Sequence, residues 1–396
     1  MMEDSLRGAA AIVGIGELKP ERSRPGRDVP SLVAEAAYLA IQDAGLTKED
    51  IDSFVMDGGM EGVSGFNTMM AEHMGIYPTF ATGCDAQGAA GVTMALQAAA
   101  YVNAGLAKFV LCGMGAAIDG TRRQRPAAPR ETQTWSSEFM VPYGPTVAAN
   151  GNYAMIARRH EELYGTTVEK RAKIAADFRY NANHNPMAIF HDTPITTEDV
   201  VNSRIVADPL HLLECVMPCA GGCAFIVTSA EIAASMRHQP AYILGGALGI
   251  SRSNLQYVGE ITVSPVGRAA RKAFEMAGYG PSDVEVMEIY DSFTITVICE
   301  LEESGFCNKG EGGDWVQEHS LKFDGDKPCN THGGQLSYGQ ASTAGGCAQV
   351  TEAVRQIRRD AGEHQVPGPT DLVYVTGSGG SFSQQSALLL GSEVAL

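Results

Sequence analysis

A short stretch near the carboxyl end of the chain, residues 330–340, combines residue types that could form a ligand site. It reads NTHGGQLSYGQ. The glycines let the backbone come close to a bound molecule, and polar loops on a rigid scaffold often carry binding and catalytic groups. Asn330, His332, Tyr338 and Gln340 are therefore candidates for contact with a ligand.

Four other residues could supply polar groups or backbone donors. Tyr290 ends a predicted buried strand, Asp291 follows it, and Gly380 ends the motif GSGG. Gly88 stands at the start of a long alanine-rich segment that is typical of a helix. The first turn of a helix presents free N–H groups and the positive end of its dipole, so it can hold negative charge.

Composition narrows the classes of function. The chain has 396 residues, is 44% hydrophobic and only 19% charged, and can bury a large core. Its net charge of −17 disfavours binding to nucleic acid or to an anionic membrane surface. No apolar run approaches the roughly 20 residues that cross a bilayer, so no membrane association is expected.

Nine cysteines are scattered along the chain without a Cys-x-x-Cys pair. This spacing disfavours a zinc site, and no metal is expected. The N-terminus lacks the basic region of a signal peptide, and the cysteine count is odd. We therefore expect a cytoplasmic protein with reduced thiols.

Strand-like and helix-like patterns alternate along the chain, which indicates an α/β layered fold. In the first part, strands are expected at residues 9–14, 50–57 and 109–113, and helices at 31–45 and 88–105. In the second part, strands are expected at residues 241–247, 284–290, 372–377 and 386–391, and helices at 266–278 and 343–360.

The two parts resemble each other. Residues 40–52 and 273–284 each contain a helix that ends in Ala-Gly, then a polar turn and the start of a strand. This internal similarity predicts two halves, residues 1–235 and 236–396. An insertion from about 116 to 206, with helical patterns at 147–164 and 168–181, should cover or line a ligand site.

Taken together, these motifs resemble the thiolase superfamily over nearly the whole chain. The resemblance rests on the two halves, on ADPL at 207–210, on YDSF at 290–293 and on the Asn-x-x-Gly-Gly pattern that begins at Asn330. It is nearest to sterol-carrier-protein-type thiolases and the lipid-transfer-protein aldolases. It implies two halves in a layered α-β-α-β-α arrangement with an inserted loop domain.

Catalytic positions of a thiolase are altered in this chain. The nucleophilic cysteine of the family stands seventeen residues before the glycine that ends the long helix, which corresponds to Gly88 when counted from Gly105. Gln340 stands at the position of the family's histidine, and the motif that ends at Gly380 has no cysteine. A plain Claisen mechanism needs a thiolate to carry the acyl group, so the resemblance implies another reaction.

The resemblance to the aldolase branch implies retro-aldol cleavage of a β-hydroxyacyl-CoA. Cleavage of the degraded side chain of a steroid or similar bulky ring compound would give a ketone and a short acyl-CoA, and no permanently bound cofactor is expected. Tyr290 and Tyr338 are the expected acid and base, and Asp291 is expected to orient them.

An oxyanion hole is expected to hold the thioester enolate. Its predicted members are the backbone N–H groups of Gly88 and Gly380 and the side chain of Asn330. Two further residues are expected in supporting roles, His332 and Gln340.

Two alternatives stay open at the level of sequence. Cys84 lies four residues before Gly88 and could be the nucleophile of a CoA-dependent acyltransferase. The chain could also be a thiolase-like subunit that binds a CoA ester without turnover. The resemblance further implies a homodimer and a small partner with an OB-fold of the DUF35 type.

Overall fold

The computed structural model describes residues 6–57, 65–119, 148–252, 255 and 258–396. Nine of the described strands join in one sheet with the order β3-β2-β4-β7-β1-β8-β11-β10-β9, and two short strands of the inserted segment form a separate two-stranded sheet. The strands of the first half are β1 (Ala10–Glu17), β2 (Ser53–Met56), β3 (Phe80–Gly83), β4 (Val110–Ala116) and β7 (Gly221–Ser229). Those of the second half are β8 (Ala241–Ile250), β9 (Val286–Glu288), β10 (Leu372–Gly379) and β11 (Gln384–Gly391).

The sheet consists of two similar parts that meet at one short contact. Strands β1 and β8 pair at only two positions, where Ala11 faces Tyr242 and Ile12 faces Ala241. On either side of this contact the order β2-β4-β7-β1 mirrors the order β9-β10-β11-β8. The first part has the parallel pairs β2–β3 and β2–β4 and the second part the parallel pair β9–β10, and the other strand pairs in both parts are antiparallel. This correspondence agrees with the internal similarity in the sequence.

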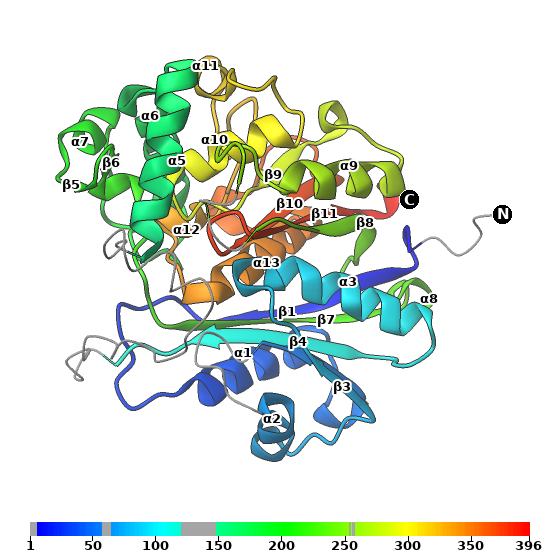
Figure 1. Cartoon of the computed structure of the whole chain (residues 1–396). Coiled ribbons are helices and arrows are strands. Elements are labelled where there is room, and N and C mark those ends of the chain that lie inside the picture. Colours follow the sequence, from blue (N-terminus) through cyan, green and yellow to red (C-terminus); the bar gives the residue numbers. More distant parts are fainter. Residues whose placement is uncertain (1–5, 58–64, 120–147, 253–254, 256–257) are drawn as a thin grey trace.

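Helices separate and cover the two parts of the sheet (Figure 1). The central pair is α3 (Ala90–Asn103) and α13 (Gly345–Arg358), with α1 (Val29–Asp43) and α2 (Phe66–Met74) on one outer face and α9 (Val266–Ala277) and α10 (Thr294–Glu303) on the other. The fold is therefore a layered α-β-α-β-α arrangement, as expected. Glycine permits the close contact of the central helices, because a Cβ on Gly91 would lie 2.4 Å from the carbonyl oxygen of Gly346.

The inserted segment packs beside the second half at the end where α13 begins (Figure 1). Its described elements are α5 (Ala148–Tyr164), α6 (Val168–Asn183), α7 (Thr197–Asn202), β5 (Ile205–Ala207) and β6 (Leu210–His211). Buried apolar side chains of α5 and α6, among them Tyr153 and Phe178, share one core with Phe293 and with Leu336 of α12 (Gly334–Ser337).

The sequence located most of these elements, with errors at their ends. The helix expected from residue 88 begins with a 3-10 turn at Gln87–Ala89 before α3, and the strand expected from residue 50 is shortened by a 3-10 turn at Lys48–Asp50. Strands β3 and β7 are not among the ranges expected from the sequence. Residues 120–147 of the insertion lie outside the described residues, and the division at residues 235 and 236 stays a prediction. Among the described helices, none has the length and apolarity needed to cross a membrane.

Candidate active site

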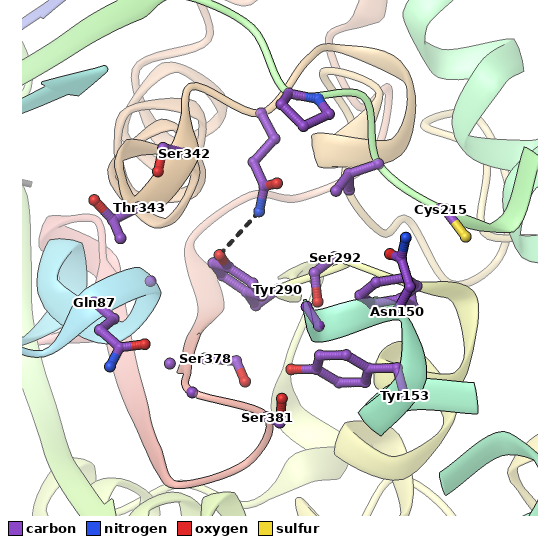
Figure 2. Close-up of a pocket in the computed structure, with 18 of the residues that line it drawn as sticks. Gln87, Asn150, Tyr153, Cys215, Tyr290, Ser292, Ser342, Thr343, Ser378 and Ser381 are labelled. Carbon is purple, nitrogen blue, oxygen red and sulfur yellow. Dashed lines mark hydrogen bonds between the residues drawn. The ribbon is translucent and has the colours of Figure 1, made fainter. Parts of the chain in front are cut away.

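A cavity of about 560 Å³ opens where the N-terminal ends of the central helices approach the insertion (Figure 2). Helices α3 and α13 each begin after a 3-10 turn, and both turns contribute residues to its wall. The cavity is lined by Gln87, Gly88, Ala149, Asn150, Tyr153, Arg204, Val206, Leu212, Cys215, Val216, Pro218, Tyr290, Ser292, Phe293, Gln340, Ser342, Thr343, Ser378, Gly379, Gly380 and Ser381.

The backbone of this wall adopts left-handed conformations at residues that are not glycine. Gln87 has a φ of 50°, Ser342 of 50° and Ser381 of 52°. Such conformations cost about 1–3 kcal/mol each and concentrate at functional sites. Because all three residues line one cavity, local strain supports the cavity as the candidate active site.

The Tyr290 hydroxyl is held at the centre of the cavity by the residue that stands at the expected histidine position. The Gln340 side chain donates a hydrogen bond from Nε2 to the Tyr290 oxygen over 3.2 Å, the dashed line in Figure 2. It donates another over 2.9 Å to Oε1 of Gln335. The backbone N–H of Tyr290 donates to Thr376 over 2.8 Å. Burial, followed by the nearby Tyr153 hydroxyl, raises the pKa of Tyr290 well above its ordinary value, so the hydroxyl carries its proton at neutral pH.

Gly88 is required because Tyr290 occupies the space that a side chain would fill. A Cβ built on Gly88 would lie 2.2 Å from the carbonyl oxygen of Ser378, 2.3 Å from the Tyr290 hydroxyl oxygen and 2.5 Å from its ring carbon Cζ. Real Cβ atoms do not approach so closely, and a cysteine side chain cannot be placed here. A phenol therefore occupies the position from which a thiolase nucleophile would act.

Of the three residues expected to form an oxyanion hole, Gly88 and Gly380 line the cavity and Asn330 does not. The Asn330 side chain is fully buried. Its Oδ1 accepts from the backbone N–H of Ile289 over 2.7 Å, and its Nδ2 donates to the Ile289 carbonyl over 2.8 Å. The amide thus fixes the chain just after β9, and its expected contact with the thioester oxygen is wrong.

Asp291 holds the start of α12 in place, and the orienting role toward the tyrosines that was expected for it stays a prediction. Its buried carboxylate accepts the N–H groups of Gln335 over 2.8 Å and Leu336 over 3.1 Å, at the start of α12. A Cβ on Gly334, which has a φ of 61°, would lie 2.2 Å from Asp291 Oδ2. Asp291 therefore sets the path of the loop that carries Gln340 to Tyr290.

Tyr338 and His332 lie behind the cavity rather than in its wall, so the structure does not bring Tyr290 and Tyr338 together as an acid and base. Both side chains are buried, and their rings meet at a centroid distance of 5.0 Å. His332 Nδ1 is 3.2 Å from Glu288 Oε2. The pKa of Tyr338 is raised by burial and, next, by Glu17. Neither residue reaches a ligand in this cavity.

Sequence reasoning missed Tyr153, which enters the cavity from α5. Its ring stacks on Phe293 at a centroid distance of 4.4 Å and meets the edge of Phe382 at 5.5 Å. Figure 2 shows its hydroxyl directed toward Ser378 and Ser292. The signal in the sequence is weak, because Asn150 and its neighbours only mark the first turn of an amphipathic helix and no motif contains Tyr153.

The cysteine of the acyltransferase alternative is inaccessible. Cys84 is 5% exposed and does not line the cavity. Burial, then the charges of Asp57 and Asp85, raises the pKa of its thiol to about 12. A nucleophilic cysteine needs a stabilised thiolate in an accessible place, so this geometry disfavours Cys84. Cys215 lies in the cavity wall, with its pKa likewise raised to about 12 by burial.

Comparison with known proteins shows the family of the chain. The family model Thiolase C-terminal domain-like matches residues 247–392. The chain is 35% identical to the steroid side-chain-cleaving aldolase of Thermomonospora curvata over 98% of this chain and 99% of that protein. It is 34% identical to the 17-hydroxy-3-oxo-4-pregnene-20-carboxyl-CoA lyase of Mycobacterium tuberculosis, over 98% of this chain and 100% of the other.

A solved structure described as the Ltp2-ChsH2(DUF35) aldolase is 35% identical and superposes with a TM-score of 0.86, covering 98% of this chain and 99% of that one. The chain therefore belongs to the thiolase superfamily, in the branch that contains the sterol-carrier-protein-type thiolases and the side-chain-cleaving aldolases.

Proposed function

We propose that this chain is a thiolase-fold aldolase that cleaves a β-hydroxyacyl-CoA by a retro-aldol reaction. The proposal rests on one observation at the centre of the cavity. The Tyr290 hydroxyl fills the space next to Gly88 that a nucleophilic side chain would need. Without a nucleophile at that position no acyl-enzyme can form there. Cleavage through a thioester enolate needs only proton transfer and a site for negative charge.

Tyr290 is the proposed acid. Its oxygen accepts a hydrogen bond from Gln340, so its own proton is free to be donated to a ligand. The N–H groups at Gly88 and Gly380, both in the cavity wall, are the proposed donors to the enolate oxygen. Loss of one such donor typically lowers kcat by roughly 10² to 10³. Tyr338 and Asn330 are not part of the proposal, because they lie outside the cavity.

The proposed substrate is the CoA thioester of a bulky ring compound with a degraded side chain. Apolar side chains form much of the wall, including Val206 and Leu212 at the end of the insertion and Phe293 at the start of α10. Apolar walls with a few polar groups suit a hydrophobic ligand held in one orientation. The names of the two most similar relatives given above point to steroid side chains, and one of them names a CoA ester.

The proposed assembly is a homodimer with a DUF35-type partner. Strand β3 is the outermost strand of the sheet, paired with β2 on one side only, and its residues Ala81 and Gly83 are exposed. An uncovered edge strand is a template for pairing with a second chain. The solved relative carries DUF35 in its description. We also propose a cytoplasmic location, since all nine cysteines are free, as in a reducing compartment.

The test is a mass-spectrometric assay of the chain, alone and with a DUF35 partner, on 17-hydroxy-3-oxo-4-pregnene-20-carboxyl-CoA. The expected products are the 17-ketone and propionyl-CoA, with Tyr290→Phe slower by about 10² to 10⁴. A covalent acyl adduct on Cys84 without cleavage would refute the aldolase and restore the acyltransferase. Binding of the ester without turnover in the partnered complex would identify a non-catalytic subunit.

A further inference from the structure

Retro-aldol cleavage moves two protons, and Tyr290 accounts for one of them. The β-hydroxyl group loses its proton as its carbon becomes a carbonyl, and the electron pair of the Cα–Cβ bond passes into the thioester enolate. The enolate carbon then gains a proton. Since the hydrogen bond from Gln340 leaves Tyr290 as a donor, the group that accepts the hydroxyl proton must be another side chain.

Tyr153 has the position that this second role requires. It lines the same cavity as Tyr290 but comes from α5, so the two phenols approach a ligand from different elements. After burial, Tyr153 is the next cause of the raised pKa of Tyr290, and both phenols line one cavity (Figure 2). Stacking on Phe293 and the edge contact with Phe382 fix the Tyr153 ring in one orientation.

The surroundings of the Tyr153 oxygen suit a phenolate better than those of Tyr290. The side-chain hydroxyls of Ser292 and Ser378 line the cavity together with Tyr153 and lower its pKa against the effect of burial. Ser378 receives a hydrogen bond of 3.1 Å from Gln385 Nε2, so its own proton is available for Tyr153. Gln385 also donates over 2.7 Å to the buried carboxyl of Glu300, which holds this chain of contacts in place.

We propose that Tyr153 is a second catalytic residue, the group that accepts the proton of the substrate's β-hydroxyl while Tyr290 protonates the enolate carbon. This inference rests on the proposed function. The step is balanced, because one proton leaves the hydroxyl oxygen for Tyr153 and one leaves Tyr290 for carbon. The Cα–Cβ bond breaks without an oxidant or reductant. The proton gained by Tyr153 returns to Tyr290 before the next turnover.

The pH dependence follows from the groups around Tyr153. These are Glu300 and Cys299 of α10 and Tyr290, together with the uncharged Ser292 and Ser378. Burial raises the pKa of Tyr153 to about 12. A phenolate that acts as base is therefore a minor form near neutrality, and kcat/KM should rise by roughly tenfold per pH unit from about pH 7 to 9.

The first test compares Tyr153→Phe with Tyr164→Phe in the complex with the DUF35 partner. Both changes remove a hydroxyl from a tyrosine of α5, but Tyr164 does not line the cavity. Tyr153→Phe should lower kcat/KM by about 10² to 10⁴ and remove the rise with pH, and Tyr164→Phe should change neither. Ser378→Ala keeps the Tyr153 hydroxyl but removes one stabilising contact, so the rise should move to higher pH.

A second readout separates this inference from the proposed function. The complex is incubated with propionyl-CoA in D2O, and exchange at Cα reports the proton transfer of Tyr290 alone. Tyr153→Phe should keep this exchange and lose cleavage, whereas Tyr290→Phe should lose both.

Wild-type rates of cleavage in Tyr153→Phe would overturn the role of Tyr153 and leave the aldolase intact. Loss of exchange as well as cleavage in Tyr153→Phe would also overturn it, because the defect would then extend to Tyr290. Absence of cleavage in the wild-type complex would instead overturn the proposed function.

Discussion

The replacement Gly88→Ala tests the coupling between Gly88 and Tyr290 most directly. The added Cβ would lie 2.2 Å from the Ser378 oxygen and 2.3 Å from the Tyr290 oxygen. Ordinary contacts begin near 3.4 Å, so Tyr290 or the β10 backbone at Ser378 must move by about 1 Å. Overpacking of this size costs about 1–3 kcal/mol of stability. A misplacement of about 1 Å at a catalytic group can lower the rate by roughly 10².

The assay measures cleavage by the partnered Gly88→Ala variant together with its free energy of unfolding in urea. The matched control is Gly368→Ala, because a Cβ at Gly368 meets nothing within 4 Å and its backbone is not left-handed. The control should keep its activity and its stability within about 0.5 kcal/mol. If Gly88→Ala behaved like this control, the Tyr290 hydroxyl could not occupy the space beside Gly88, and the reasoning about the missing nucleophile would be refuted.

Three other outcomes are expected. Burial raises the pKa of Glu300 to about 8 from an ordinary 4.5, so the folded state binds an extra proton and loses stability as pH rises through that interval. Glu300→Gln should flatten this dependence in urea denaturation, and an unchanged slope would contradict it. Iodoacetamide should modify Cys215 in the cavity wall before the buried Cys84, which peptide mass mapping measures. The Cys215→Ala variant should still cleave the substrate after the same treatment. Asp291→Asn should cost about 1–3 kcal/mol, measured by denaturation, because one N–H of α12 loses its acceptor.

The layered fold could be predicted because its signals are local and occur twice. Each half has a helix that ends at a glycine with positive φ, Gly45 after α1 and Gly278 after α9, followed by a 3-10 turn and a strand. Hydrophobic periodicity gives the type of each element. Counting back from Gly105 also placed Gly88 correctly in the cavity wall, because a helix converts a number of residues into a fixed length.

The direction of loop side chains could not be predicted in the same way. Tyr338 follows α12, and its backbone N–H donates over 2.7 Å to the carbonyl of Gly334, which continues the helical turn. That turn directs the phenol into a cluster with Ala182 of α6 instead of into the cavity. The Asn330 side chain also lies outside the cavity, because its amide hydrogen-bonds to the backbone N–H and carbonyl groups of Ile289. Both outcomes depend on contacts distant in sequence.

Gly88 and Tyr290 depend on each other, because the missing side chain at residue 88 leaves the room that the Tyr290 hydroxyl fills. A glycine at the nucleophile position would by itself leave an empty space at the start of α3. The Tyr290 hydroxyl fills that space, and Gln340, at the expected histidine position, reaches the same oxygen. Restoring a cysteine at Gly88 alone would force its Cβ against both the phenol and the Ser378 carbonyl. The site therefore has a geometry of its own, in which packing excludes a nucleophilic side chain at residue 88 and a phenol takes the space instead.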